Sequence, residues 1–100
     1  GETSAAIRER VTKARAVQKA RYTGEGIACN SELSGKMIEK HCIMTAEASR
    51  LLRQAFSKME LSMRSFNKII KVARTIADLE SREIITENHI AESLQMRFSW

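Results

Sequence analysis

Apolar residues recur at helical spacing through the middle of the chain. Two segments carry the strongest stripes, and polar residues such as Glu47, Arg50 and Arg53 occupy the opposite side of the first. After Thr45 the stripe is Ala48, Leu51, Leu52, Ala55, Phe56 and Met59; after Ser62 it is Phe66, Ile69, Ile70, Ala73, Ile76 and Ala77. A repeat of three and four residues places these side chains on one face, so the pattern predicts two helices that each bury that face.

Helix starts are marked by a shared local pattern. An apolar residue precedes a capping hydroxyl, and a second apolar residue follows the cap by four positions, which allows the two apolar side chains to pack across the first turn. The pattern is formed by Leu33, Ser34 and Ile38, by Leu61, Ser62 and Phe66, and by Ile85, Thr86 and Ile90. Thr45 is a fourth capping residue, although polar Ser49 replaces the second apolar residue there. We therefore expect helices to begin at Ser34, Thr45, Ser62 and Thr86.

The other segments are consistent with an all-α fold. A narrow apolar stripe predicts a helix from Ser4 to about Arg21, with Ile7, Val11, Ala14 and Val17 on one side. Residues 22–33 contain Gly24 and Gly26 and are expected to form a loop. The chain has no proline, few aromatic residues and 43% hydrophobic residues, which suits helices around one core. We expect one domain over residues 1–100, a compact bundle of four longer helices and a short one around Met37 to His41, with the last helix ending near Arg97.

Positive charge is concentrated in the first helix. Residues 1–24 carry a net charge of +4, whereas the other 76 residues carry +1. A basic helix of this kind can follow a phosphate backbone, because each neutralised phosphate releases counterions. The side chains available for such contacts are Arg8, Arg10, Lys13, Arg15 and Lys19. The simpler interpretation is a solvated basic face, since Tyr22 is the one ring nearby that could stack on a base.

Arg64 stands at an unusual position for a cation. If Ser62 caps the helix, Arg64 is the second helical residue, where the helix dipole and the unpaired backbone N–H groups are already positive. A helical wheel places Arg64 on the outer face with Lys68, Lys71, Thr75 and Asp78. A bound anion such as phosphate would make the position of Arg64 favourable. Lys68, one turn further on, would add positive charge to the same site. The alternative is an exposed arginine whose stem covers apolar surface, or one paired with Glu60.

Several chemistries have no matching pattern. The phosphate-binding pattern Gly-x-x-x-x-Gly-Lys-[Ser/Thr] is absent, because Met37 follows Gly35 and Lys36. Two histidines and two cysteines without a Cys-x-x-Cys pair make a poor set of metal ligands, so we expect no metal site and no catalysis by this domain alone. The chain lacks a long apolar run and a signal-peptide pattern, and we expect a cytoplasmic protein with no membrane partner. The start at Gly1 suggests a piece of a longer protein.

Two strings in the second half of the chain are distinctive: Leu61-Ser62-Met63-Arg64, followed by Val72-Ala73-Arg74-Thr75-Ile76-Ala77-Asp78-Leu79. They are the most specific part of a resemblance of nearly the whole sequence to the carboxy-terminal domain of magnesium-chelatase-like AAA+ ATPases of the ComM group. Shorter matches support it: the string Ile7-Arg8-Glu9-Arg10-Val11, the pair His41-Cys42, and the closing Ile90-Ala91-Glu92-Ser93-Leu94-Gln95.

The resemblance implies a helical lid that follows the nucleotide-binding core of a ring-forming ATPase. In such proteins the lid carries a sensor arginine that reaches the terminal phosphate of ATP, and Ser62-x-Arg64 is the matching motif. The implied partners are the protein's own core domain and neighbouring subunits of a hexamer, with ATP and Mg bound by the core. Lys68 is expected to assist at the nucleotide, and Lys71 and Arg74 at the nucleotide or a subunit contact.

Three further interpretations remain at the level of sequence. ComM-type members resemble motors that migrate DNA branches, whereas true magnesium chelatases insert the metal into a porphyrin. A free-standing nucleic-acid-binding module would instead use the basic first helix and would bind in a salt-sensitive way. A helical docking domain for another protein would show an exposed apolar patch on that helix.

Overall fold

Capping hydroxyls begin three of the helices. In the computed structural model, which describes residues 1–97, the Oγ1 atom of Thr3 accepts the Ala6 N–H at the start of α1 (Ser4–Arg21). The Thr45 Oγ1 accepts the Ala48 N–H at 3.1 Å and begins α3 (Ala46–Lys58). The Ser62 Oγ accepts the Ser65 N–H at 3.1 Å and begins α4 (Met63–Leu79). These bonds satisfy backbone donors that the first helical turn leaves unpaired.

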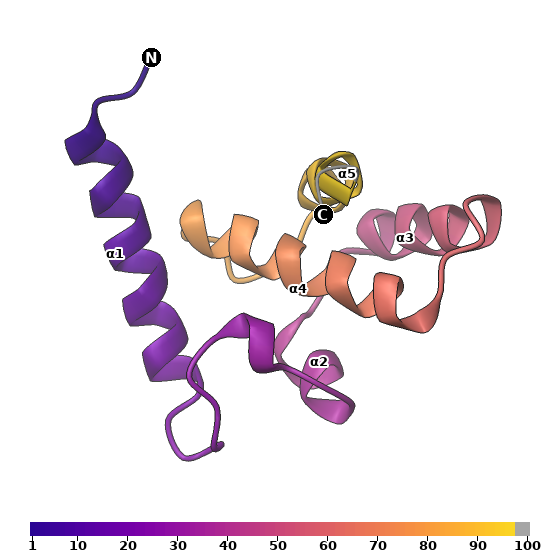
Figure 1. Ribbon diagram of the computed structural model, residues 1–100, viewed down its shortest axis with the longest axis horizontal. Coiled ribbons are helices and arrows are strands. Elements are labelled where there is room, and N and C mark those ends of the chain that lie inside the picture. Colours follow the sequence, from indigo (N-terminus) through magenta and orange to yellow (C-terminus); the bar gives the residue numbers. More distant parts are fainter. Residues whose placement is uncertain (98–100) are drawn as a thin grey trace.

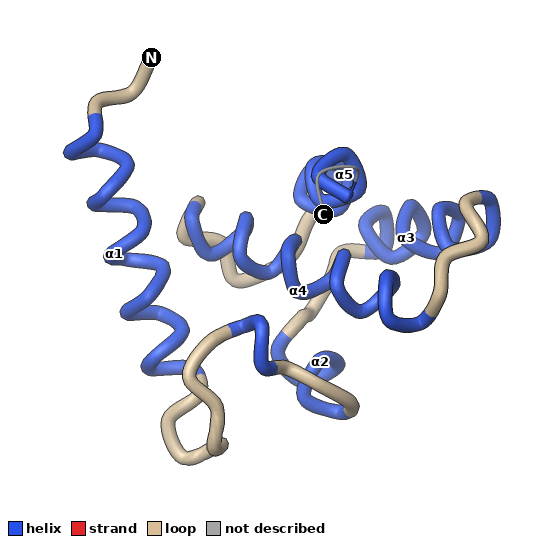
Figure 2. Tube along the Cα trace, viewed as in Figure 1, coloured by secondary structure: helices blue, strands red, loops and turns tan. Residues whose placement is uncertain are grey.

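The other helices differ in detail from their predicted bounds. The short helix α2 (Lys36–His41) begins after Gly35 and not at Ser34, because Gly35 adopts a positive φ of 54° that favours glycine. Helix α5 (Glu87–Met96) follows Thr86, whose backbone N–H is accepted by the Nδ1 atom of His89 at 2.9 Å. The predicted loop 22–33 contains a 3₁₀ turn, η1 (Asn30–Glu32). All regular structure described in residues 1–97 is helical, as Figure 2 shows, and the all-α expectation is confirmed.

Helix α4 is the centre of the molecule. It runs across the middle of Figure 1, and α1, α2, α5 and η1 all contact it, whereas α3 packs on α5. An isolated parallel bridge between Met44 and Ile85 holds the starts of α3 and α5 together, through an Ile85 N–H donated to the Ile43 carbonyl at 2.9 Å. Segments far apart in sequence therefore meet around one central helix.

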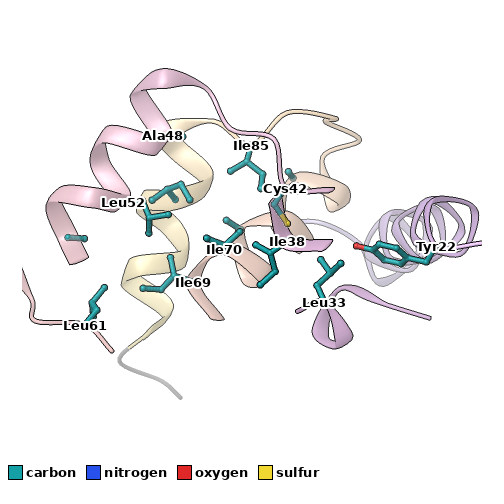
Figure 3. Packing of buried hydrophobic residues seen from close by; sticks show 14 residues of the cluster. Tyr22, Leu33, Ile38, Cys42, Ala48, Leu52, Leu61, Ile69, Ile70 and Ile85 are labelled. Atoms are coloured by element: carbon teal, nitrogen blue, oxygen red, sulfur yellow. The ribbon is translucent and has the colours of Figure 1, made fainter. Parts of the chain in front are cut away.

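The core follows the apolar stripes. Leu33, Ile38, Leu52, Ile69, Ile70 and Ile85 are all buried in one cluster, which Figure 3 shows between the helices. Phe56 departs from its predicted buried place: its side chain is 36% exposed and meets Phe66 edge to face, with ring centroids 5.2 Å apart. Burial of aliphatic side chains supplies most of the driving force for such a bundle.

Helix α1 lies at the edge of the bundle. Of its four predicted apolar positions only Ala14 is buried, whereas Ile7 is 44% and Val17 is 41% exposed. Helix α1 stands apart at the left of Figure 1, with α4 as its neighbouring helix. The contact of α1 with the rest of the molecule is therefore made mainly by its C-terminal half and by Tyr22, which is buried in the core cluster.

Candidate functional site

The start of α4 carries no negative charge. Its first turn contains no acidic residue, so the partial positive charge of the helix end and the Arg64 guanidinium lie together without a compensating carboxylate on the same turn. Arg64 is exposed, as the helical wheel predicts. Its guanidinium forms neither the ion pair with Glu60 that the sequence allowed nor any other hydrogen bond or ion pair with a residue in 1–97.

Arg64 borders a cavity on one side of α4. The cavity has a volume of about 540 Å³, and its apolar lining comes from Val72, Ile76 and Leu79 on α4 with Met96 on α5. Three cations of α4 line it, namely Arg64, Lys68 and Lys71. The structure thus brings together the two residues predicted for nucleotide binding, and the lining contains no acidic side chain within the described part of the chain. A cationic rim beside an apolar lining suits a ligand with an anionic and an apolar part.

Lys71 and Arg74 have different environments, although both were predicted as contacts. Lys71 lies at the cavity, where its Nζ donates to the Ser31 carbonyl at 3.3 Å. Arg74 is only 1% exposed, and its guanidinium is turned inward, whereas the predicted contact with a nucleic acid or a neighbouring subunit calls for a position at the surface. Its guanidinium donates to the carbonyls of Glu83 at 2.6 Å, Arg82 at 2.5 Å and His41 at 3.3 Å. Through these hydrogen bonds Arg74 holds the C-terminal end of α2 and the α4–α5 connection against α4.

Asp78 also lies inside the molecule and not on the outer face where the wheel placed it. Asp78 is 2% exposed. Its carboxylate accepts two hydrogen bonds from the Arg21 guanidinium, at 2.6 and 2.9 Å, and forms an ion pair with the Arg74 guanidinium at 3.2 Å. The side chain of Asn30 donates to it at 2.9 Å. The hydrogen bonds to Asp78 raise the pKa of Arg21 above its ordinary value. A carboxylate shared by two arginines joins α1, η1 and α4.

This buried polar cluster was missed at the sequence level, although one signal was present. Arg74 and Asp78 are opposite charges four residues apart, a spacing that brings them side by side on a helix. On the wheel Arg74 borders Ile70 of the buried stripe, whereas Asp78 lies nearer Lys71 on the outer face. The signal therefore concerns the pair: an arginine at the edge of a buried stripe with a carboxylate one turn away indicates an internal ion pair, whereas Arg64 and Lys68 are exposed.

The basic residues of α1 are exposed except at the C-terminal end of the helix. Four of them were predicted as nucleic-acid or interface contacts and all are exposed: Arg8, Arg10, Lys13 and Arg15. Arg10 and Lys13 form ion pairs with Glu2 and Glu9. The fifth cation of the basic-module interpretation, Lys19, is exposed as well.

Metal binding, thiol chemistry and membrane insertion were also considered from the sequence. No group of three or more His, Cys, Asp or Glu side chains in residues 1–97 is arranged to hold a metal ion. Cys42 is buried in the core cluster, where burial raises the pKa of its thiol to about 11. Among these residues no helix has both the length and the apolar character that crossing a bilayer requires.

The fold and the site together define a small all-α domain with a cationic helix start beside an apolar cavity. Residues 1–97 match the family described as magnesium chelatase, subunit ChlI C-terminal, and the chain belongs to that family. The resemblance seen in the Ser62-x-Arg64 motif and the run after it is thereby confirmed.

Relatives place the chain within longer proteins. It is 41% identical over 97 residues to the competence protein ComM of Haemophilus influenzae, and the match covers 97% of this chain and 18% of that protein. It is 34% identical to YifB of Escherichia coli and 30% identical to Rv2897c of Mycobacterium tuberculosis, again over 97 residues, or 97% of this chain and 18% and 19% of those proteins. The chain therefore spans less than a fifth of the length of these relatives and corresponds to the C-terminal domain of ComM- and YifB-type proteins.

Proposed function

We propose that this domain is the helical lid of an AAA+ ATPase and that Arg64 contacts the terminal phosphate of ATP bound with Mg by a core domain of the same protein. The observation that supports the proposal best is the position of Arg64: an exposed guanidinium without an acidic partner, on a helix start without an acidic residue. Such a site has positive charge from the backbone and from the side chain, and triphosphate oxygens complement both.

Lys68 extends the same positive surface. It lies one turn after Arg64 and lines the same cavity. In the proposed complex Arg64 contacts the phosphate directly, because its planar fork donates two parallel hydrogen bonds, and Lys68 adds charge beside it. Closing the domain over ATP would then couple the state of the nucleotide to the position of α4, and through α4 to the helices packed on it and to neighbouring subunits of a hexameric ring.

The similarity to ComM favours a motor that acts on DNA over a chelatase. The identity of 41% is to a protein named for competence, whereas the name of the family refers to magnesium chelatase. We propose a DNA-remodelling, branch-migrating motor as the parent and retain a magnesium chelatase subunit as the second candidate. Stimulation of the ATPase activity of the full-length protein by branched DNA supports the first, and stimulation by a porphyrin substrate supports the second.

The role of Arg64 is tested by ATP turnover in the full-length protein. We expect Arg64→Ala to lower kcat on the order of 10²-fold, the size of effect seen when one group that stabilises developing charge is removed. Arg50→Ala is the matched control, because Arg50 is an exposed arginine of α3 without a partner in the described residues. The domain should keep its fold, since Arg64 supports no internal contact. Equal turnover in both variants would contradict the proposal.

A further inference from the structure

The cations of α1 fall into two groups. Three of them have acidic partners: Arg10 with Glu2, Lys13 with Glu9 at 3.2 Å, and Arg21 with Asp78 at 2.6 Å. The side chains of the other three, Arg8, Arg15 and Lys19, have no hydrogen bond or ion pair with any residue of the described chain. The sequence alone indicates only the Glu9–Lys13 pair, by its spacing of four residues, because the partners of Arg10 and Arg21 lie further away along the chain.

The unpaired cations share one face of α1. Arg15 follows Arg8 by seven residues and Lys19 follows Arg15 by four, and at about 100° per residue these spacings align side chains along the helix. All three are exposed, as is Thr12 between them, whereas the buried residues of α1, Ala14 and Gln18, lie on another face. The distance along the axis from Arg8 to Lys19 is about 16 Å. We refer to Arg8, Arg15 and Lys19 as the cationic ridge.

The ridge is free of acidic and apolar residues. Glu9 is the only acidic residue within α1, and its carboxylate pairs with Lys13 away from the ridge. The exposed large apolar residues of α1, Ile7 and Val17, lie on other faces of the helix, and Val11, one turn from both Arg8 and Arg15, is half-buried. A membrane-binding helix needs apolar side chains next to its cations, so the ridge has the composition of a surface for a hydrated polyanion. Its position on the edge helix of the bundle leaves it accessible (Figure 1).

We propose that the cationic ridge binds the phosphate backbone of nucleic acid. A straight row of about 16 Å corresponds to about five base pairs of duplex, at 3.4 Å of rise for each. The ridge offers no aromatic ring and no amide side chain to read base edges, so the binding is independent of sequence. This inference does not rest on the role of Arg64, which lies on α4.

The test measures binding of the 100-residue chain to labelled duplex and single-stranded DNA by fluorescence anisotropy over a range of salt. Three phosphate contacts give a slope of log K against log salt of about −2.7 for duplex and about −2.1 for a single strand. A rise from 50 to 200 mM salt should therefore weaken duplex binding about 40-fold. The ridge variant, Arg8→Gln with Arg15→Gln and Lys19→Gln, should remove most of this slope.

A matched variant removes the same charge from paired positions. Arg10→Gln, Lys13→Gln and Lys40→Gln replace three exposed cations that have carboxylate partners, Lys40 through Glu25 at 3.2 Å. This control should bind nearly as tightly as the native chain, and circular dichroism should show both variants folded. Equal weakening of both variants, or no binding by the native chain, would overturn the proposal. Binding of similar strength to polyglutamate or to vesicles of anionic phospholipid would overturn the assignment to nucleic acid.

Discussion

Individual buried side chains differ in what they do for this domain. Cys42 is a packing residue: it is 4% exposed within the core cluster, and its thiol is kept protonated by burial. Asp78 and Arg74 are polar, but their charges are matched by each other and by Arg21, and backbone carbonyls accept from both terminal nitrogens of Arg74, whose Nε is the one buried side-chain donor left without a partner in the described residues. Burial of polar groups is tolerated here because partners replace water.

The thiol of Cys42 makes stability depend on pH. Its pKa is raised from the ordinary 9.0 to about 11 in the folded protein, so the unfolded chain releases this proton at a lower pH than the folded chain. Stability contributed by the group is complete below pH 9 and is lost as the pH rises toward 11. Between pH 9 and about 11 the free energy of unfolding of the native chain should fall by about 2 to 3 kcal/mol at most, relative to that of Cys42→Ala. Urea unfolding at a series of pH values measures the difference, and parallel curves would contradict it.

Helix starts are the feature of the elements that the sequence predicts best. Thr45, Ser62 and Thr86 precede helices as expected, because capping depends on residues within one turn. The start of α2 was missed by one position, since the positive φ of Gly35 offered an alternative to the Ser34 cap. The exposure of Arg64 and Lys68 was also predictable from the wheel. The places of Arg74 and Asp78 were not, because their partners Arg21 and Glu83 lie on other segments that the fold brings together.

The cap of α4 can be tested on its own. Ser62→Ala removes the acceptor of the Ser65 N–H and should lower the free energy of unfolding by about 1 kcal/mol. Ser57→Ala in the exposed part of α3 is the control and should change stability by less than about 0.5 kcal/mol, since Ser57 has no recorded partner in the described residues. Equal effects of the two substitutions, measured by urea unfolding, would show that the cap contributes nothing.

At the scale of the whole molecule, α1 is held by polar contacts more than by apolar ones. Arg21 and Tyr22 connect it to α4 and η1, and Tyr22 donates its hydroxyl to the Asn30 side chain. Few apolar residues of α1 are buried, so its docking depends strongly on Asp78. The domain therefore combines a core around α4 with an edge helix attached at one end.

Asp78→Asn tests this organisation. The substitution removes the charge shared by two arginines and should lower the free energy of unfolding by about 3 kcal/mol or more, because both guanidinium groups lose their only carboxylate among the described residues. Glu9→Gln breaks an exposed pair instead and should change stability by less than about 1 kcal/mol. Amide hydrogen exchange in Asp78→Asn should speed up first in α1. Uniform acceleration across all helices would argue against separate attachment of α1.

The convergence of three backbone carbonyls on Arg74 limits how the connections between helices can vary. Residues 41, 82 and 83 must each present an oxygen to the same guanidinium, so an inserted or deleted residue between α4 and α5 would pull at least one of them out of register. The turn at Gly24 and Gly26 is held less tightly: Glu25 in it pairs with Lys40 and His41, but the Cβ positions of the glycines meet nothing within 4 Å. A fluorescent label or an affinity tag introduced into this protein therefore belongs in the turn between α1 and η1, and the α4–α5 connection should keep its native length.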